Sequence, residues 1–302
     1  MRAILFGASK AGENYVSNHP DIEVVAFTDN DSAKHGTRFM GYPIIAPADI
    51  NTHDVDSIII TSQWVDQIYS QLTEEMGIDK SNIIVPSKQS VKAALPFEDN
   101  ETLAFAQSVM RTLNRYFVSH NISACLDSGT LLGAVRNKGL IPWDDDIDFA
   151  VDKDNYERLQ ASLPELYELL NTNYDVKWNI VIITVNNIDC CINLEFSNSS
   201  HTQLVPFDIS IQRRESINGL SELLSSGGLF FAPATHFDSY EPISFLGETF
   251  LAPFDAEGFL TFMYGHWQTP KKTTQITEYE NRRASMSAPR TGINVQKRTI
   301  SQ

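Results

Sequence analysis

The chain has 302 residues, a formal net charge of −15, 42% apolar residues and 20% charged residues. This length suggests about two domains, and the composition is that of an ordinary soluble globular protein. The acidity disfavours a nucleic-acid polymer as a partner, and no run of the sequence approaches the roughly 18 apolar residues of a membrane span.

The N-terminus and the cysteines favour a cytoplasmic protein. Residues 1–9 lack the apolar segment of a signal peptide, so we expect a strand there. The three cysteines, Cys125, Cys190 and Cys191, are odd in number, and two are sequence neighbours with poor geometry for a disulfide. We expect reduced, buried thiols. A membrane-bound acceptor would then be met at the inner face of the membrane.

Strands alternate with helices in the first third of the chain. This pattern predicts an α/β domain with a Rossmann-like parallel sheet, which we place at residues 1–92. The expected strands are 2–6, 22–28, 57–61 and 82–85, and the expected helices are 11–18 and 63–76.

A glycine turn follows the first strand. Gly7 and Gly12 are spaced more loosely than in the dinucleotide fingerprint, so the turn alone is a weak signal. Ser9 and Lys10 stand where the start of the next helix can meet a pyrophosphate. Asp29 ends the second strand, where such folds place a ribose-binding acid. These residues are the candidates for a nucleotide site.

The patterns FGASKAG, FTDND and GYPII resemble the small Rossmann-like domains of bacterial polysaccharide enzymes. The resemblance implies that this domain binds a nucleotide or nucleotide sugar. The alternative is a domain that only packs, dimerises or docks. An NAD-dependent oxidoreductase is less favoured, because the unit is short and has no evident catalytic Tyr-Lys pair. Residues 87–100 are the expected linker.

An amphipathic helix is predicted at residues 101–118, before the stretch that carries the chemistry. Asp146 and Asp148 lie two apart in a segment of strand composition, so they share a face, while Ile147 and Phe149 point to a core. The carboxylates, about 6–7 Å apart along a strand, repel each other unless a cation lies between them. Hard oxygen ligands suit Mg²⁺ or Mn²⁺. The alternative, a solvated acidic loop, is weakened by the alternating apolar residues.

Polar residues upstream of this acid pair predict a phosphate seat. Ser128, Gly129 and Thr130 offer N–H and hydroxyl donors near an expected helix start, and Gly129 allows close approach of a ligand. Asp127 either braces the turn or contacts the acceptor. These groups together favour metal-assisted attack on a phosphoryl group.

The sequence LDSGTLLGAVR, followed by IPWDDDID, resembles the signature of the LicD family, which includes the fukutin-type transferases. A Tyr-Gly-x-Trp-x-x-Pro element at 264–270 extends the resemblance to about residues 103–272. It implies an α+β nucleotidyltransferase-fold domain, placed here at 98–302. It also implies metal-dependent transfer of phosphocholine, or of an alditol phosphate such as ribitol or glycerol phosphate, from a CDP-linked donor to a glycan or lipid-linked glycan.

A nucleotidyltransferase site usually has a third carboxylate beside the paired ones. Asp208, in a Pro-Phe-Asp-Ile setting, resembles the later acid of the family and is favoured, and Glu195 is the reserve. The alternative for either is an edge-strand acid facing water. The expected strands of this region are 176–185, 190–196 and 204–211, after a helix at 155–163 capped by Asp154.

The rest of the chain supplies further candidates for substrate binding. Residues 221–240 are expected to form a loop over the site, residues 245–253 a hairpin turning at Gly247-Glu248, and residues 256–263 a helix; the tail from Ser285 is expected to be flexible. The residues proposed to contact the donor or the leaving group are Arg136, Lys138, Trp143, His266 and Lys271. Trp267 is favoured as a buttress of the fold, and Arg136 and Lys138 have the alternative of solvated loop cations.

The hypothesis is that Asp146 and Asp148 hold one or two divalent ions, with Asp208 completing the site. An acceptor hydroxyl attacks the phosphorus that carries the choline or alditol, and CMP leaves. The alternatives are a nucleotidyltransferase that transfers NMP by attack at the α-phosphate, and a non-catalytic scaffold of polysaccharide assembly.

Overall fold

The computed structural model describes residues 1–92, 95–272, 276–278, 281–282 and 295–300. The chain forms two compact units. Residues 1–92 build the first unit, which residues 271–272 and 276–278 join, and residues 95–270 build the second, which residues 281–282 and 295–300 join. The chain therefore passes between the units more than once.

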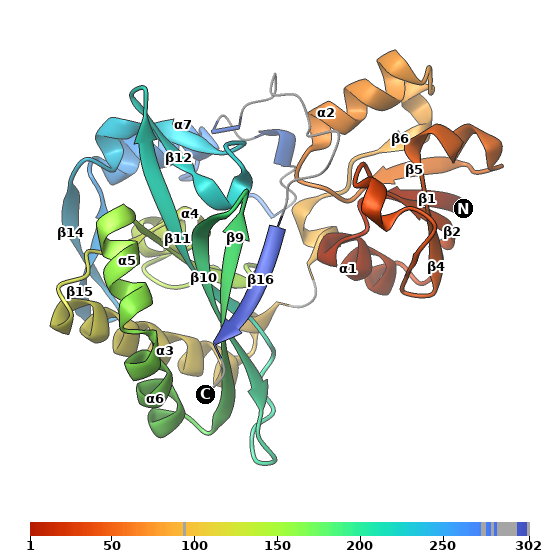
Figure 1. The fold of residues 1–302 in the computed structure, drawn as a ribbon. Helices are drawn as coiled ribbons and strands as arrows, with labels where there is room; N and C mark the ends of the chain where they lie inside the picture. Colours follow the sequence, from red (N-terminus) through yellow and green to blue (C-terminus); the bar gives the residue numbers. More distant parts are fainter. Residues whose placement is uncertain (93–94, 273–275, 279–280, 283–294, 301–302) are drawn as a thin grey trace. The chain divides into compact units, whose positions relative to one another are not determined.

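The first unit is a six-stranded sheet in the order β3-β4-β2-β1-β5-β6, parallel except for the β3–β4 pair. Its elements (Figure 1) are β1 (Arg2–Phe6), α1 (Lys10–Asn18), β2 (Glu23–Thr28), β3 (Arg38–Phe39), β4 (Tyr42–Ile45), β5 (Ser57–Ile60), α2 (Val65–Ser70) and β6 (Ile83–Ile84).

The parallel sheet predicted for this unit is confirmed, and it follows from burial of β1 on both faces. Ile4 and Phe6 pack into one apolar core, and Ala3 and Leu5 pack into another. A strand covered on both faces reads as a continuous apolar run, as in RAILF. The short strands β3 and β4 were not predicted. The second expected helix is shorter than predicted, since α2 passes into a wider π turn at Gln71–Glu75.

The second unit is built on a larger sheet, in the order β14-β15-β7-β8-β11-β10-β9-β16. Two short strands extend it, because β12 pairs with β11 and β13 pairs with β12. The strands are β7 (Cys125–Leu126), β8 (Asp146–Val151), β9 (Val176–Val185), β10 (Ile188–Asn198), β11 (Asp208–Ile217), β12 (Leu220–Leu223), β13 (Phe231–Pro233), β14 (Tyr240–Phe245), β15 (Glu248–Pro253) and β16 (Val295–Ile300).

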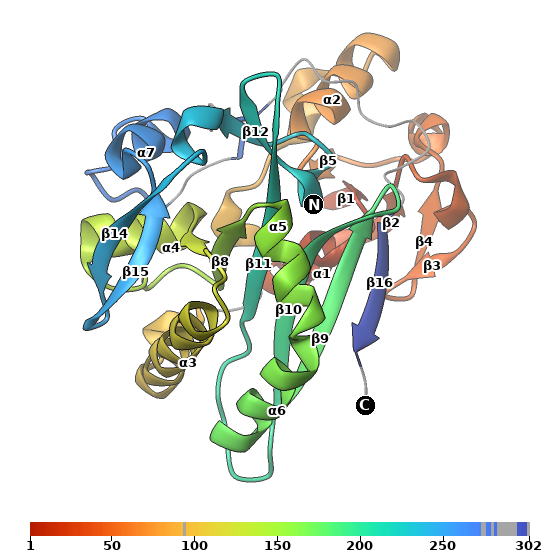
Figure 2. The same cartoon turned by 60° about the vertical axis from the view of Figure 1, so that its left-hand side comes forward.

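Helices cover one face of this sheet. Figure 2 shows α5 lying along β11, and α6 packs against β9. Ile147 of β8 and Ile209 of β11 point to this side and are fully buried in the main core. The helices are α3 (Asn100–Ser119), α4 (Ser128–Leu132), α5 (Lys153–Ala161), α6 (Leu163–Asn173) and α7 (Ala256–Tyr264), with a π turn at Gly133–Asn137 after α4. None of the helices in the described part of the chain combines the length and apolarity needed to cross a membrane.

Several boundaries differ from the sequence predictions. Asp152, not Asp154, caps α5, because its side chain accepts a hydrogen bond from the Asn155 N–H. A second helix, α6, follows Ser162 where none was predicted. Residues 221–240, expected to be a loop, contain β12 and β13. The expected hairpin begins earlier, at Tyr240, and turns at residues 246–247, both with positive φ.

The tail was predicted to be flexible from Ser285. Residues 285–294 lie outside the described part of the chain, but Val295–Ile300 forms β16, an antiparallel partner of β9. Arg298 of β16 donates to both carboxylate oxygens of Asp189. Asp189 also accepts from Thr184 at 2.6 Å and from Gln160 at 2.9 Å. This carboxylate therefore links β16, β9 and α5.

Asp189 predicts a measurable acid sensitivity. Hydrogen bonds from Arg298, and then from Thr184 and Gln160, lower the pKa of Asp189 from 3.8 to about 2. A lowered pKa in the folded state means that the stabilisation is complete above pH 4 and is lost as the pH falls toward 2. Asp189→Asn should therefore lower the free energy of unfolding at pH 7 by about 1–2 kcal/mol, discounted for the half-exposed Arg298.

Urea unfolding of both proteins between pH 7 and pH 2 checks this. The difference between parent and Asp189→Asn should shrink below pH 4. A difference that is the same at every pH would show that the Asp189 charge adds nothing to stability.

Candidate active site

Two neighbouring parallel strands bring the predicted acids together. In the register of β8 and β11, Asp146 is paired with Asp208, and Asp148 with Ser210. Paired residues of adjacent strands share a face, and Ile147 and Ile209 occupy the other face, so Asp146, Asp148 and Asp208 all lie on the face opposite the core. We call these three residues the acid row. The strand β11 lies between β8 and β10, so Asp208 is not an edge-strand acid.

Asp148 is the most enclosed member of the acid row, with 8% of its surface exposed. Its backbone N–H donates to Thr130 Oγ1 at 2.9 Å, and its carbonyl oxygen accepts from the Asp127 N–H at 3.1 Å. Its Oδ1 accepts from Gln212 Nε2 at 2.9 Å. The backbone and the carboxylate of Asp148 are thus both fixed before any ligand binds.

The loop before β8 adds two more carboxylates. Asp144, Asp145 and Asp146 are half-buried and can each offer an oxygen within 4.8 Å of the others. Asp146 belongs to both this group and the acid row. A donor set made only of carboxylate oxygens fits a hard cation such as Mg²⁺ or Mn²⁺. Among the described residues, the Asp144–Asp146 group therefore fits a divalent metal, and Asp146 links this group to the acid row.

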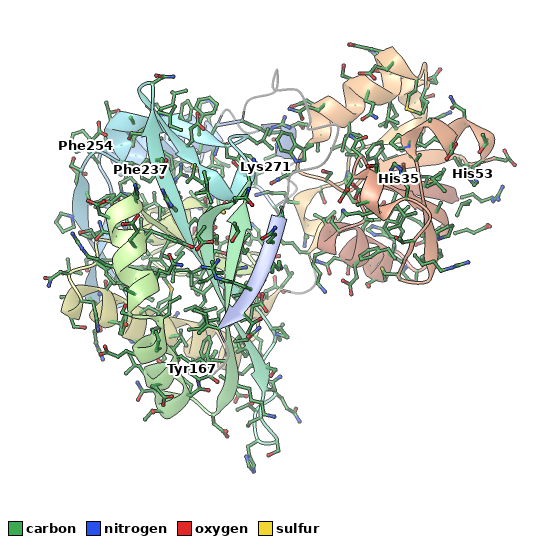
Figure 3. The ribbon with its side chains drawn as sticks, in the orientation of Figure 1. His35, His53, Tyr167, Phe237, Phe254 and Lys271 are labelled. Carbon is green, nitrogen blue, oxygen red and sulfur yellow. The ribbon has the colours of Figure 1, made fainter. Side chains whose placement is uncertain are left out.

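A buried ion pair holds the turn that precedes α4. Asp127 Oδ2 accepts from Arg214 Nε and Nη2, both at 2.9 Å, and the two side chains are 1% and 3% exposed. Asp127 Oδ1 accepts from the Ser128 N–H at 2.7 Å. The Arg214 guanidinium also lies 4.3 Å from the ring centroid of Phe237, which is labelled in Figure 3. Of the two roles left open for Asp127, these contacts support bracing of the turn.

The expected phosphate seat is only partly accessible. Thr130 is 2% exposed, and its hydroxyl holds the backbone of Asp148. Ser128 and Gly129 are partly exposed, and Ser128 adopts a positive φ of 50°. The Asp144 carboxylate lies against Gly129, since a Cβ built there would be 2.1 Å from Asp144 Oδ2. A phosphate at this turn would have to share the space with Asp144.

Arg136 lies among aromatic residues beside the acidic loop. Its Nη1 donates to the Trp267 carbonyl at 3.2 Å, and its guanidinium lies 5.9 Å from the ring centroid of Trp143. Burial lowers the pKa of Arg136, and nearby Tyr264 and Asp144 act in the opposite direction. Arg136 therefore lies near both Trp143 and Asp144.

The remaining candidates of the second unit differ in exposure. Lys138 is exposed with a positive φ of 56°, and His266 is exposed. Trp267 is 7% exposed and donates from Nε1 to Thr261 Oγ1 at 3.1 Å, which is the contact of a buttress. Glu195 lies on β10, and its Oε2 accepts from Asn179 at 3.5 Å. Its register places it beside Asp208 on the same face.

Two site residues were missed by sequence reasoning, Gln212 and Arg214. Both follow Asp208 at even spacing along β11, and Ile209 and Ile211 alternate with them. That period of two was available in the sequence DISIQRR. It predicts that Ser210, Gln212 and Arg214 share the face of Asp208.

Close packing explains the two glycines of the turn in the first unit. A Cβ on Gly7 would lie 2.7 Å from the Thr61 carbonyl, and one on Gly12 would lie 2.6 Å from the Gly7 carbonyl. Ser9 Oγ donates to the Thr61 carbonyl at 3.3 Å, and Lys10 pairs with Glu13 on α1. Close packing of the turn thus accounts for both glycines.

Asp29 already has several partners. Its Oδ2 accepts from Lys34 Nζ at 2.7 Å and from the Ala8 N–H at 3.1 Å, and its Oδ1 accepts from the Asp31 N–H. His35, labelled in Figure 3, contacts the Asp29 carbonyl at 2.7 Å. These contacts tie the end of β2 to the glycine turn. Lys271, also labelled, groups with this first unit and pairs with Glu278.

All three cysteines are free and buried, as predicted. Burial raises the pKa of each thiol, to about 11 for Cys190. A buried thiol of raised pKa is a poor nucleophile. The cysteines therefore contribute packing rather than chemistry.

Comparison with protein families divides the chain as the two units do. Residues 1–84 match the family described as C2185-like, N-terminal. Residues 121–255 match the family described as LicD/FKTN/FKRP, nucleotidyltransferase domain. The second match includes the acid row, the acidic loop and the Asp127–Arg214 pair.

Curated relatives match over short segments. The lipopolysaccharide cholinephosphotransferase LicD of Haemophilus influenzae is 46% identical over 61 residues, which are 19% of this chain and 23% of that protein. An uncharacterized protein of Rickettsia prowazekii is 38% identical over 73 residues, which are 24% of this chain and 27% of that protein. The chain thus spans about a quarter of the length of these relatives.

Solved structures resemble the chain only weakly. UDP-D-quinovosamine 4-dehydrogenase from Vibrio fischeri matches at a TM-score of 0.24 and 19% identity, over 28% of this chain and 76% of that one. Biliverdin reductase from Synechocystis matches at a TM-score of 0.25 and 10% identity, over 92% of this chain and 94% of that one.

The buried Asp127–Arg214 ion pair predicts that removing one partner lowers the free energy of unfolding more than removing both charges does. Arg214→Met leaves the Asp127 carboxylate buried without its cation, which should lower the free energy of unfolding by about 3–5 kcal/mol. The double variant Asp127→Asn with Arg214→Met should recover part of that loss, because no unpaired charge remains. Urea unfolding of the three proteins measures this. A single variant within 1 kcal/mol of the parent, or no recovery in the double variant, contradicts it.

Proposed function

We propose that this chain, whose residues 121–255 match the nucleotidyltransferase domain of the LicD/FKTN/FKRP family, is a phosphotransferase that modifies cell-surface glycans. The finer proposal is that it moves phosphocholine, or an alditol phosphate such as ribitol or glycerol phosphate, from a CDP-linked donor to a glycan hydroxyl. The reaction depends on Mg²⁺ or Mn²⁺ and releases CMP.

The observation that carries the proposal is the acid row. Asp146, Asp148 and Asp208 share one face of two adjacent parallel strands, opposite a fully apolar core face. Such a cluster on a sheet is unfavourable for folding unless positive charge meets it, because neighbouring like charges repel. A metal-bound pyrophosphate would bring both a cation and a substrate to the row.

In the proposed mechanism, Asp146 and Asp148 would hold the metal, and Asp208 would be either a third ligand or the base. A bound Mg²⁺ or Mn²⁺ would neutralise charge on the pyrophosphate oxygens. The acceptor hydroxyl forms a bond to the phosphorus that carries the choline or alditol. The bond from that phosphorus to the bridging oxygen breaks, and CMP leaves with the electron pair. The hydroxyl proton passes to Asp208 or to water.

Other side chains are proposed to position the donor. Arg136 is held by the Trp267 carbonyl beside Asp144, where a guanidinium can meet a phosphate of the leaving CMP. Ser128 offers its hydroxyl, and Gly129 its backbone N–H, next to the same loop. Trp143, Lys138 and His266 remain candidates for the rest of the donor.

The type of group transferred is supported by one relative. The Haemophilus influenzae protein is by its name a lipopolysaccharide cholinephosphotransferase, and its matched segment is nearly half identical to this chain. That name supports a phosphate-linked group and a surface glycan.

For the first unit we propose a nucleotide or nucleotide sugar at the glycine turn. We propose residues 1–92 and 98–302 as the two domains, with residues 271–272 and 276–278 of the second packing on the first unit. Lys34, paired with Asp29, supplies a cation beside that turn. Lys10 is exposed at the start of α1. We also propose that the chain meets its lipid-linked glycan at the membrane surface.

The test incubates the protein and Mn²⁺ with CDP-choline, CDP-ribitol, CDP-glycerol and CDP-ethanolamine, with and without glycan acceptors, and measures released CMP. One donor should give metal-dependent CMP release. Asp148→Ala or Asp146→Ala should reduce that release by about 100-fold or more, with an unchanged circular dichroism spectrum.

A matched variant separates the two ligand sets around Asp146. Asp145 belongs only to the Asp144–Asp146 group, so Asp145→Asn should retain most activity. Asp208 belongs only to the acid row, so Asp208→Asn should lose most activity. The reverse result would move the metal to the loop. A product whose mass carries NMP would replace phosphotransfer with nucleotidyl transfer, and near-normal turnover of Asp148→Ala would refute the metal assignment.

A further inference from the structure

Two polar side chains, Gln212 and Ser225, connect to Asp148 of the acid row and have no role in the proposed mechanism. Gln212 of β11 is half-buried, and its Nε2 donates to Asp148 Oδ1 at 2.9 Å. Its Oε1 accepts from Ser225 Oγ at 2.5 Å. The contacts run in series from the hydroxyl of Ser225, through the amide of Gln212, to the carboxylate of Asp148.

The chemistry of the three groups allows one orientation of the amide. An ionised carboxylate only accepts hydrogen bonds, so the NH₂ end of Gln212 must face Asp148. The carbonyl end then faces Ser225, whose hydroxyl can donate. A flipped amide would set two oxygens against each other at the carboxylate and lose the bond to Asp148, although the Ser225 hydroxyl could then accept from the NH₂ group. Gln212 is therefore held at both ends.

The third member of the series comes from a separate segment. Ser225 lies in η8, the 3₁₀ helix Leu224–Ser226 between β12 and β13, which packs against β9, β10 and β11. Ser226 Oγ donates to the Leu223 carbonyl at 2.6 Å and accepts from the Phe230 N–H at 2.9 Å, which fixes the shape of this segment. The position of η8 thus sets the position of the Ser225 hydroxyl.

We infer that Gln212 is a positioning residue for the metal site, which orients the Asp148 carboxylate, and that Ser225 holds Gln212 in the working orientation. The inference rests on the proposed metal-dependent function. A carboxylate ligand is aimed by its own hydrogen bonds, and loss of such a partner typically weakens metal binding by about 10–100-fold. Gln212 acts through Asp148 and touches neither metal nor substrate.

The test measures Mn²⁺ affinity directly, by the loss of the electron paramagnetic resonance signal of free Mn²⁺ on titration with the full chain. Gln212→Met keeps the length of the side chain and removes the amide, and should weaken Mn²⁺ binding about 10–100-fold. Ser225→Ala should weaken it less, because the amide keeps its bond to Asp148. Adding Ser225→Ala to Gln212→Met should change nothing further, since the two act in series.

Gln160→Met is the matched control. Gln160 is also half-buried, and its Nε2 also donates to a carboxylate at 2.9 Å, but that carboxylate is Asp189, outside the acid row. The control should bind Mn²⁺ as the parent does while losing some stability. A general effect of removing a glutamine amide would appear in both variants.

The outcomes separate this inference from the proposed function. Parent-like Mn²⁺ affinity in Gln212→Met, or an equal loss in Gln160→Met, would overturn the positioning role and leave the metal site standing. Absence of Mn²⁺ binding by the parent, up to millimolar concentration, would remove both. Weakened binding in Gln212→Met alone, with a retained melting temperature, supports the inference.

Discussion

The parallel pairing of β8 with β11 is the constraint on which this site depends. It sets Asp146 beside Asp208 on one face, and Ile147 beside Ile209 in the core. Because side chains alternate along a strand, a slip of one residue would exchange the two faces and bury the acids. The apolar face therefore fixes the register, and the register assembles the acids.

Side chains of β11 reinforce this pairing from the polar face. Gln212 bonds to Asp148 of β8, and Arg214 pairs with Asp127 at the turn before α4. Alternate residues of β11 thus hold both the turn and the strand of the acid pair. Two residues before Gln212 on the same strand, Ser210 bonds instead to Asn193 of β10 at 3.0 Å. Buried polar contacts of this kind add little net stability, but any arrangement that leaves one of these groups unpaired is strongly destabilised. They favour one geometry of the site over its near alternatives.

Local pattern was enough to predict much of this fold. The apolar runs of the first unit, the helix before the site and the acid pair on β8 all follow from periodicities of two or 3.6 residues. The partners of Asp127 and Asp148 were beyond reach, because Arg214 and Gln212 are far away in the sequence and only the β8–β11 register brings them near. The strand β16 was missed because its sequence, VQKRTI, is polar and exposed, and its place at the edge comes from pairing with β9 and from the Arg298–Asp189 ion pair. The role of Asp29 was read from its position alone, and Lys34 enters the picture only through the structure.

The path of the chain between its two units bears on how the molecule can be dissected. Residues 271–272 and 276–278 group with the first unit, although almost the whole of the second unit precedes them, and residues 281–282 and 295–300 return to the second. A single proteolytic cut in the linker would separate neither unit cleanly. A fragment ending at residue 92 would lack the later segment that packs on α2, and a fragment beginning after the linker would carry that segment without its partner. The first unit is therefore not an exchangeable cassette that recombination could move by its N-terminal sequence alone.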